Sequence, residues 1–207
     1  MSNTSLSNIL IEEVNDAYAQ MAHRDNLWEN SPWRHINDLE NDTVGKLGEK
    51  FISRICNEAQ IDNHIDGLTT KELGGGVGDG TINGYSVEIK TARLGSSSPS
   101  FQHELGEKPW KSDYMLFLDI TPEEFFISIF PNWTEEEYKT SQKKWAPYFP
   151  TKSCTWRKGT GAFKFDTTYK INITQSKTTY PNTFRWTPDT NILAITDFIL
   201  SIIPPPQ

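Results

Sequence analysis

The feature that most constrains the fold of this 207-residue chain is a short stretch, residues 78–90, that predicts a β-hairpin with its turn at Asn83-Gly84. An Asn-Gly dipeptide favours a two-residue hairpin turn, because both turn positions need a positive φ angle. The residues that follow, 87–90, alternate apolar and charged side chains, which is the pattern of a strand with two different faces. The stretch therefore predicts two antiparallel strands joined by a tight turn.

This predicted hairpin brings three charged residues together. Residues two apart on a strand point to the same face, so Glu88 and Lys90 project side by side, and the turn folds Asp79 back beside Glu88. Carboxylates are the oxygen ligands that Mg²⁺ prefers, and bound Mg²⁺ can orient or deprotonate a water that attacks a phosphate. A lysine can hold that water or balance charge on the phosphate. The pattern suits phosphodiester hydrolysis; the alternative is a surface hairpin with an exposed Glu/Lys pair.

An amphipathic helix is predicted before the hairpin, beginning at residue 39 or 43 and ending at 59. Its apolar residues recur at steps of four and predict a core stripe. The stripe consists of Leu47, Phe51, Ile55 and Ala59. Glu49 lies near the edge of this stripe, where it can be an ordinary solvated residue or can face the hairpin.

The hairpin residues resemble the active site of the PD-(D/E)XK nuclease superfamily, whose best-known members are type II restriction endonucleases. Asp79 matches the metal-binding Asp of the family, although Gly78 precedes it where many members have Pro. Glu88 matches the second acidic ligand, and Lys90 matches the lysine. The resemblance covers about residues 40–130 and fades beyond them.

The resemblance implies more than these three residues. It implies that the main-chain carbonyl of Ile89 is a metal ligand, and that Glu49, in the Gly-x-x-Gly-Glu pattern of residues 45–49, is the further helix Glu that many members carry. It implies an α/β (α+β) fold with a restriction-endonuclease-like core, in which helices flank a central mixed β-sheet. The implied cofactor is Mg²⁺, with Mn²⁺ as a substitute.

The charge is distributed unevenly along the chain. The whole chain carries a net charge of −7, but the segment 138–186 contains ten basic residues and one acid, Asp166. That segment therefore carries +9 and the remainder −16, which favours a polyanion as partner. The alternative is that these cations are spread over a solvated surface. The candidate DNA-binding residues of the segment are Lys152, Arg157, Lys158, Lys164, Lys170, Lys177 and Arg185.

A long polar loop is predicted after the lysine strand, over residues 91–104, and long loops in compact domains are often functional. Arg93 is the candidate to clamp a phosphate with two hydrogen bonds. Gln102 is a candidate to bind a phosphate or to orient the lysine, and His103 to handle a proton, although a single histidine is more often structural.

The rest of the chain predicts ordinary packing elements. Two apolar runs, 113–120 and 125–130, predict a buried central strand and the strand paired with it. Helices are predicted over 6–24, from 133, and over 191–203, and the first and last of these are expected to pack on the core or to form a dimer contact. The expected organisation is a single nuclease domain, 1–207. Its parts are a helical segment (1–38), a catalytic core (39–130), a basic, aromatic-rich region (131–188) and a C-terminal helix and tail (189–207).

The composition indicates the cellular compartment of the protein. No apolar run approaches the ~20 residues that a membrane span needs, and the first residues lack the basic and apolar regions of a signal peptide. The two cysteines, Cys56 and Cys154, are not in metal-ligand spacing and are expected to be reduced thiols, with Cys56 on a buried helix face. We therefore expect a cytoplasmic protein without a membrane partner.

The sequence thus predicts a Mg²⁺-dependent endonuclease that hydrolyses double-stranded DNA, with Asp79, Glu88, Lys90 and Glu49 as catalytic residues. The most direct version is a sequence-specific type II restriction enzyme, a homodimer with a cognate DNA methyltransferase acting on the same site. The alternatives are a nuclease of the same superfamily that repairs DNA, resolves junctions or processes phage DNA, and a non-catalytic DNA-binding module.

Overall fold

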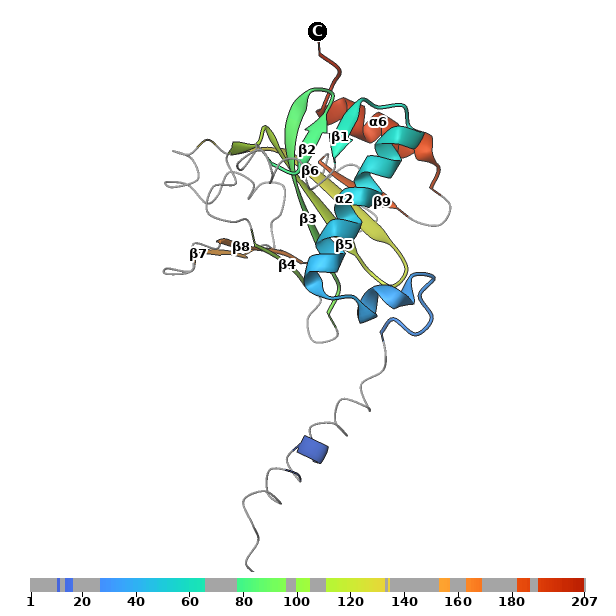
Figure 1. The fold of residues 1–207 in the computed structure, drawn as a ribbon, viewed down its shortest axis with the longest axis vertical. Helices are drawn as coiled ribbons and strands as arrows, with labels where there is room; N and C mark the ends of the chain where they lie inside the picture. The colour runs from blue at the N-terminus through green and yellow to red at the C-terminus, as the bar shows by residue number, and fades with distance from the viewer. Residues whose placement is uncertain are drawn as a thin grey trace, which may run out of the picture.

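The computed structural model describes residues 11, 14–16, 27–65, 78–95, 100–104, 111–132, 134, 153–156, 163–168, 182–186 and 190–206. Mixed α/β structure is confirmed in these residues (Figure 1). The helical elements are η1 (Arg34–Asp38), α2 (Asn41–Glu58) and α6 (Ile192–Ile202). The strands are β1 (Asn63–Ile65), β2 (Gly80–Ile82), β3 (Tyr85–Arg93), β4 (Ser100–Glu104), β5 (Tyr114–Ile120), β6 (Phe125–Pro131), β7 (Ser153–Trp156), β8 (Phe163–Thr168) and β9 (Thr183–Trp186).

The described strands form two sheets. The larger has the order β1-β2-β3-β5-β6-β9, and it is mixed because β3 and β5 run parallel while the other neighbours are antiparallel. The smaller sheet has the order β4-β8-β7 and is antiparallel. The parallel pair is joined through β4 of the smaller sheet, so the chain leaves the larger sheet after β3 and returns at β5.

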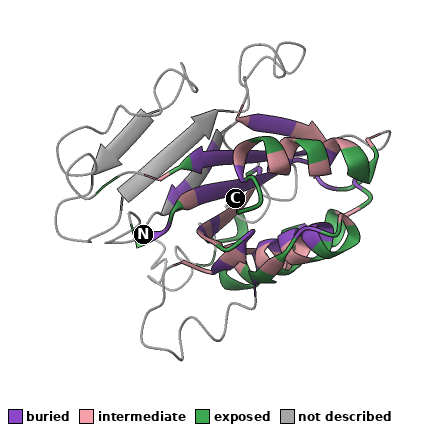
Figure 2. Cartoon of the chain, turned by 90° about the horizontal axis from the view of Figure 1, so that it is seen from above, coloured by how far each residue is buried: buried purple, intermediate pink, exposed green. Residues whose placement is uncertain are grey.

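Both faces of the larger sheet are buried. On one face, alternate residues of β3, β5 and β6 join apolar residues of α2 and α6 in a single core. On the other face, Phe117 packs against Phe130 and against His103 of β4. Burial on both sides explains why residues 115–120 are all buried and why this strand has a continuous apolar sequence. Figure 2 shows the buried strands in the interior and the exposed outer faces of the helices.

Several sequence predictions are confirmed. The hairpin, the upstream helix, the paired strands β5 and β6 and the last helix lie where the pattern placed them. Asn191 caps α6, since its side chain accepts a hydrogen bond from the backbone N–H of Ala194 at 3.1 Å. Cys56 is fully buried on α2, and burial raises the pKa of its thiol to about 12. No helix in the described parts of the chain is both long and apolar enough to cross a membrane.

Two predictions need correction and two lie largely outside the described residues. Residues 91–104 are not one loop, because β3 continues to Arg93 and 100–104 form β4. The buried stripe of α2 is formed by Val44, Gly48, Ile52, Ile55 and Cys56. Leu47 and Phe51, predicted as core, are only partly buried. Of the predicted helix 6–24, residues 11 and 14–16 are described and helical. Of the helix predicted from 133, only residue 134 is described, and it is not helical.

Helix α2 lies against β3 at Gly48. A Cβ atom placed on Gly48 would lie 1.7 Å from Thr91 Oγ1, so a side chain larger than hydrogen does not fit there. Gly45, one turn earlier, has no atom within 4 Å of the corresponding position. Only the glycine at 48 is therefore required by packing.

We expect Gly48→Ala to destabilise the protein by about 1–3 kcal/mol, because the added methyl group forces α2 away from β3. Gly45→Ala is the matched control, and we expect it to be neutral or to stabilise by about 0.5–1 kcal/mol, since alanine restricts the unfolded chain and favours helix. Urea unfolding of both variants measures the difference. Equal unfolding free energies for the two variants would contradict the close contact at Gly48.

Candidate active site

The turn of the β2-β3 hairpin is fixed by its two residues. Asn83 and Gly84 both have positive φ angles, 50° and 79°, as the Asn-Gly pattern predicted. The register pairs Ile82 with Tyr85 and Gly80 with Val87. The side chain of Asn83 is buried and donates a hydrogen bond to the carbonyl of Ile203 at 2.8 Å. The hairpin is therefore anchored to the end of α6 as well as paired with the sheet.

Asp79 extends the hairpin by one further pair of interactions. Its backbone N–H donates to the carbonyl of Val87 at 2.8 Å, and its Oδ2 accepts from the backbone N–H of Ile89 at 2.7 Å. The N–H and C=O of one strand residue point to the same side, so the carbonyl of Ile89 is directed to the edge of β3 where Asp79 lies. The carboxylate and this carbonyl thus share one edge of the strand.

Gly78 is required immediately before Asp79. Its φ angle is +84°, and a Cβ atom there would lie 2.3 Å from the carbonyl oxygen of Val87. Proline, which is common at this position in the family that the sequence resembles, has φ fixed near −65° and cannot adopt this conformation. The glycine lets the backbone approach Val87 and delivers Asp79 to the strand edge.

Glu88 and Lys90 project together from β3 and form an ion pair between Glu88 Oε1 and Lys90 Nζ. Their side chains are 20% and 25% exposed, so the pair is accessible but mostly removed from water. Burial lowers the pKa of Lys90, but Glu88, Asp79 and Glu49 act in the opposite direction and raise it above the ordinary lysine value. Lys90 is therefore an ammonium ion at neutral pH.

Glu49 joins this group from α2. It follows Gly48, whose contact with Thr91 brings the helix against β3, and its carboxylate contributes to the raised pKa of Lys90. Helix α2, the residue before β2, and β3 each supply part of the cluster, which we call the acidic cluster: Glu49, Asp79, Glu88 and Lys90. Glu88 contacts the ammonium group, and Asp79 and Glu49 act on it electrostatically, so three carboxylates influence one cation and leave an excess of negative charge.

The donors of the acidic cluster fit a hard divalent cation. Carboxylate and carbonyl oxygens are the ligands that Mg²⁺ prefers, and the excess negative charge favours a bound cation. Asp79, Glu88 and the carbonyl of Ile89 are the residues that would hold it, with Glu49 as a further ligand to the ion or to its waters. As they stand, no three Asp, Glu, His or Cys side chains of the described residues form a complete metal site. Glu88 is instead engaged by Lys90.

Arg93 lies at the end of β3 and is engaged by the backbone. Its Nη1 donates hydrogen bonds to the carbonyls of Ile36 and Leu39, at 2.6 Å for Leu39. These contacts hold the segment before α2 against the sheet. Sequence reasoning missed this binding of two carbonyl groups, and the phosphate contact of Arg93 stays a prediction.

His103 is buried on β4 and does not lie in the acidic cluster. Its Nε2 lies 2.7 Å from Asp119 Oδ1, and its ring packs on Phe117 with centroids 4.9 Å apart. Both partners belong to β5, so His103 joins the smaller sheet to the larger one. The backbone of Gln102 pairs with that of Asp166 in β8, and the side chain of Gln102 is not among the described parts of the chain. Asp119, as the buried partner of His103, was not predicted from the sequence.

The structure describes part of the basic region. The backbone of Lys164 belongs to β8, whose neighbour β4 follows β3 in the chain. Arg185 lies on β9 at the far edge of the larger sheet and forms an ion pair with buried Glu124. This pairing gives Arg185 a structural role. The other predicted DNA-binding residues of this region lie outside the described residues: Lys152, Arg157, Lys158, Lys170 and Lys177.

We expect Glu88→Gln to lower the pKa of Lys90, because it removes the strongest of the three interactions that oppose the effect of burial. In the wild type, the ion pair should give its full stabilisation at pH values below the pKa of an unfolded lysine, about 10.4. This stabilisation should be lost as the pH rises through the pKa of Lys90 in the folded state, which is higher. NMR titration of the lysine side-chain carbons measures the shift. Glu58→Gln, on the exposed face of α2, is the control, and an equal pKa in both variants would contradict the arrangement.

No family model, curated protein or solved structure matches this chain in the comparisons with known proteins. The assignment of a function therefore depends on the residues of the acidic cluster, on their geometry, and on the resemblance of their spacing to that of the PD-(D/E)XK nucleases.

Proposed function

We propose that the protein is a Mg²⁺-dependent endonuclease that hydrolyses phosphodiester bonds of double-stranded DNA on a restriction-endonuclease-like core. The observation that carries the proposal is the acidic cluster: Glu88 is paired with Lys90 on β3, Asp79 is held at the edge of the same strand, and Glu49 of α2 lies within electrostatic range of Lys90. A single exposed Glu/Lys pair on a hairpin would not need Asp79 at the same strand edge or Glu49 from a helix.

Lys90 is an ammonium group paired with Glu88 in this structure, which suits a cationic role. A lysine that remains protonated cannot take a proton from water, so it acts as a cation that holds the attacking water and offsets the charge developing on the phosphate. Bound Mg²⁺ supplies the acidity that lowers the pKa of the attacking water and stabilises the leaving oxygen. Asp79 and Glu88 position the ion, and the backbone N–H of Ile89 orients the Asp79 carboxylate.

Glu88 is the residue that the ion and Lys90 would share. In this structure Glu88 is paired with Lys90, and a bound cation would compete with the ammonium group for the same carboxylate. Glu88 would help to hold the ion, and Lys90 beside it would hold the attacking water or offset charge on the phosphate. The same ion pair therefore keeps both groups oriented before the metal and DNA arrive.

The proposed partners are double-stranded DNA, a second copy of the chain and a cognate DNA methyltransferase. The cations of 138–186 supply contacts to the phosphate backbone, which fix the position of the protein on DNA without reading the sequence. Cutting both strands of a symmetric site needs two active sites related by a two-fold axis, so we propose a homodimer. A restriction role would add a cytoplasmic location and a cognate DNA methyltransferase acting on the same site.

We expect the protein to cut bacteriophage genomic DNA with Mg²⁺ or Mn²⁺ and to be inactive with EDTA. Asp79→Asn should abolish cleavage by removing a ligand, and Lys90→Ala should slow it by about 10²–10³-fold by removing a cation at the transition state. Asp62→Asn, an exposed acid outside the acidic cluster, is the control. Gel electrophoresis of the digests is the measurement, and circular dichroism checks that each variant is folded.

The outcomes separate the alternatives. Discrete bands indicate a sequence-specific enzyme, a smear indicates a nonspecific nuclease, and preferential cutting of branched DNA indicates a junction-resolving or repair enzyme. Metal-independent DNA binding without cleavage of linear, branched or methylated DNA indicates a binding module. Full cleavage by folded Asp79→Asn protein would disprove the assignment of the active site.

A further inference from the structure

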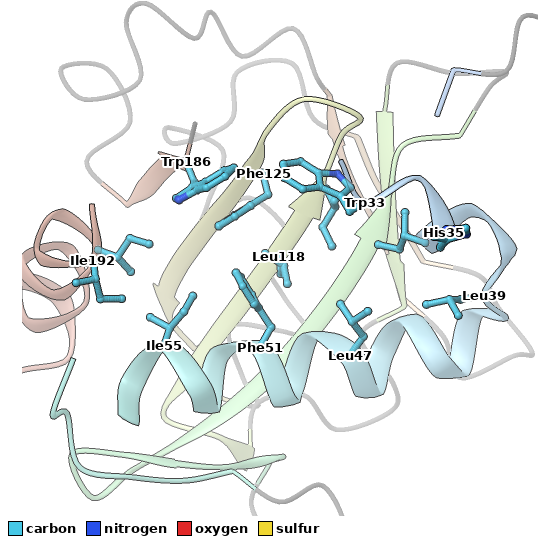
Figure 3. A pocket seen from close by; sticks show the side chains of 13 residues that line it. Trp33, His35, Leu39, Leu47, Phe51, Ile55, Leu118, Phe125, Trp186 and Ile192 are labelled. Carbon is cyan, nitrogen blue, oxygen red and sulfur yellow. The ribbon is translucent and has the colours of Figure 1, made fainter. Parts of the chain in front are cut away.

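An apolar groove lies on the α2 side of the larger sheet. It has a volume of about 600 Å³, and its lining is almost entirely apolar. One wall is formed by Leu47, Phe51 and Ile55, which project from α2 toward Phe125 and Trp186 on the opposite side (Figure 3). Ile192, at the start of α6, closes one end and is 38% exposed. The floor is formed by side chains of β5.

The groove explains why the predicted core stripe of α2 is not fully buried. Leu47, Phe51 and Ile55 recur at steps of four, which is the pattern of a helix face that packs against another element. In this structure Leu47 and Phe51 are only partly buried. Trp33 and Trp186 meet at the rim, with ring centroids 5.6 Å apart, and are also partly buried. An apolar surface is therefore left open beside α2.

A second apolar surface is predicted from the sequence of the N-terminal segment, residues 6–24, which we call the arm. The arm has apolar residues at helical spacing, and its described residues, 11 and 14–16, are helical. Ile11 and Val14 are 56% and 57% exposed. Figure 1 shows these described residues of the arm well apart from α2 and from the sheets. An amphipathic helix gains stability mainly by burying its apolar face, so this face also requires a partner.

We propose that the arm of one copy of the chain docks in the apolar groove of a second copy, and that the exchange is reciprocal. Both surfaces are apolar. A helix over the predicted range of the arm would be about 28 Å long, so it can lie beside α2 and cover Leu47, Phe51 and Ile55. A single copy exposes both surfaces, whereas a two-fold dimer buries both of them twice. In the structure of one chain the described arm residues stand away from the groove of that chain, which favours a second copy over the chain itself.

The proposal names the interface of the dimer that the proposed function calls for, but it depends on apolar contacts and not on the acidic cluster. It can therefore be tested without DNA or metal. Sedimentation velocity of the full chain in EDTA, over a series of concentrations, measures the dimer dissociation constant. We expect the wild type and Lys90→Ala to be equally dimeric, so a failure of the nuclease assignment would leave this result unchanged.

We expect two kinds of variant to weaken the dimer by about tenfold or more, because each places a charge in an apolar contact. One carries Ile11→Asp and Val14→Asp on the arm, and the other carries Ile192→Asp at the groove. Leu193→Asp is the matched control, since Leu193 is 67% exposed on the same helix and does not line the groove. Thermal unfolding by circular dichroism verifies that the variants are folded.

Mixing the arm variant with the groove variant tests the exchange itself. The mixture contains one intact arm and one intact groove on different chains, so it should form a heterodimer more tightly than either variant alone forms a homodimer. A monomeric wild type would overturn the proposal. This outcome includes a monomer whose arm folds into the groove of its own chain. A dimer that is unaffected by the arm or groove variants, or equally weakened by Leu193→Asp, would overturn it as well.

Discussion

The structure depends on the close approach of α2 to β3 at Gly48 and Thr91. Thr91 Oγ1 is buried against the helix and has no hydrogen-bond partner among the described residues. A buried unpaired polar atom costs about 1–3 kcal/mol. The contact that incurs this cost also brings Glu49 within electrostatic range of Lys90. The close approach of the helix to the strand therefore carries a cost in stability at Thr91 Oγ1.

Both faces of β3 are used, and for different purposes. Val87 and Ile89 point into the core with α2 and α6, while Glu88 and Lys90 lie on the opposite face with the smaller sheet. Asp79 reaches the strand from its edge, where the β2 ladder ends at Val87. The hairpin thus gives one strand a rigid apolar support and a charged, accessible face. This combination lets the acidic cluster remain ordered although it carries excess negative charge.

The hairpin and its charged residues could be predicted from the sequence because their signals are local. Asn83-Gly84 specifies the turn, and alternation places Glu88 and Lys90 on one face. Tertiary contacts could not be predicted in the same way. Nothing local to Arg93 indicates that its guanidinium binds the carbonyls of Ile36 and Leu39, and a helical period alone does not tell a core stripe from a docking stripe. The sequence feature that indicates the close packing of α2 on β3 is a glycine inside the helix, Gly48.

Mn²⁺ binding shows whether the acidic cluster holds a divalent cation, which the proposed function requires. Electron paramagnetic resonance during a Mn²⁺ titration counts bound ions for the wild type and for Asp79→Asn, with an uncleavable DNA duplex present in both. We expect the wild type to bind at least one ion per chain that the Asp79→Asn protein fails to bind. We also expect the pKa of Lys90 to fall in the wild type, because the ion would weaken the interaction of Lys90 with Glu88. Equal Mn²⁺ binding by the two proteins, both folded, would contradict the proposed metal site.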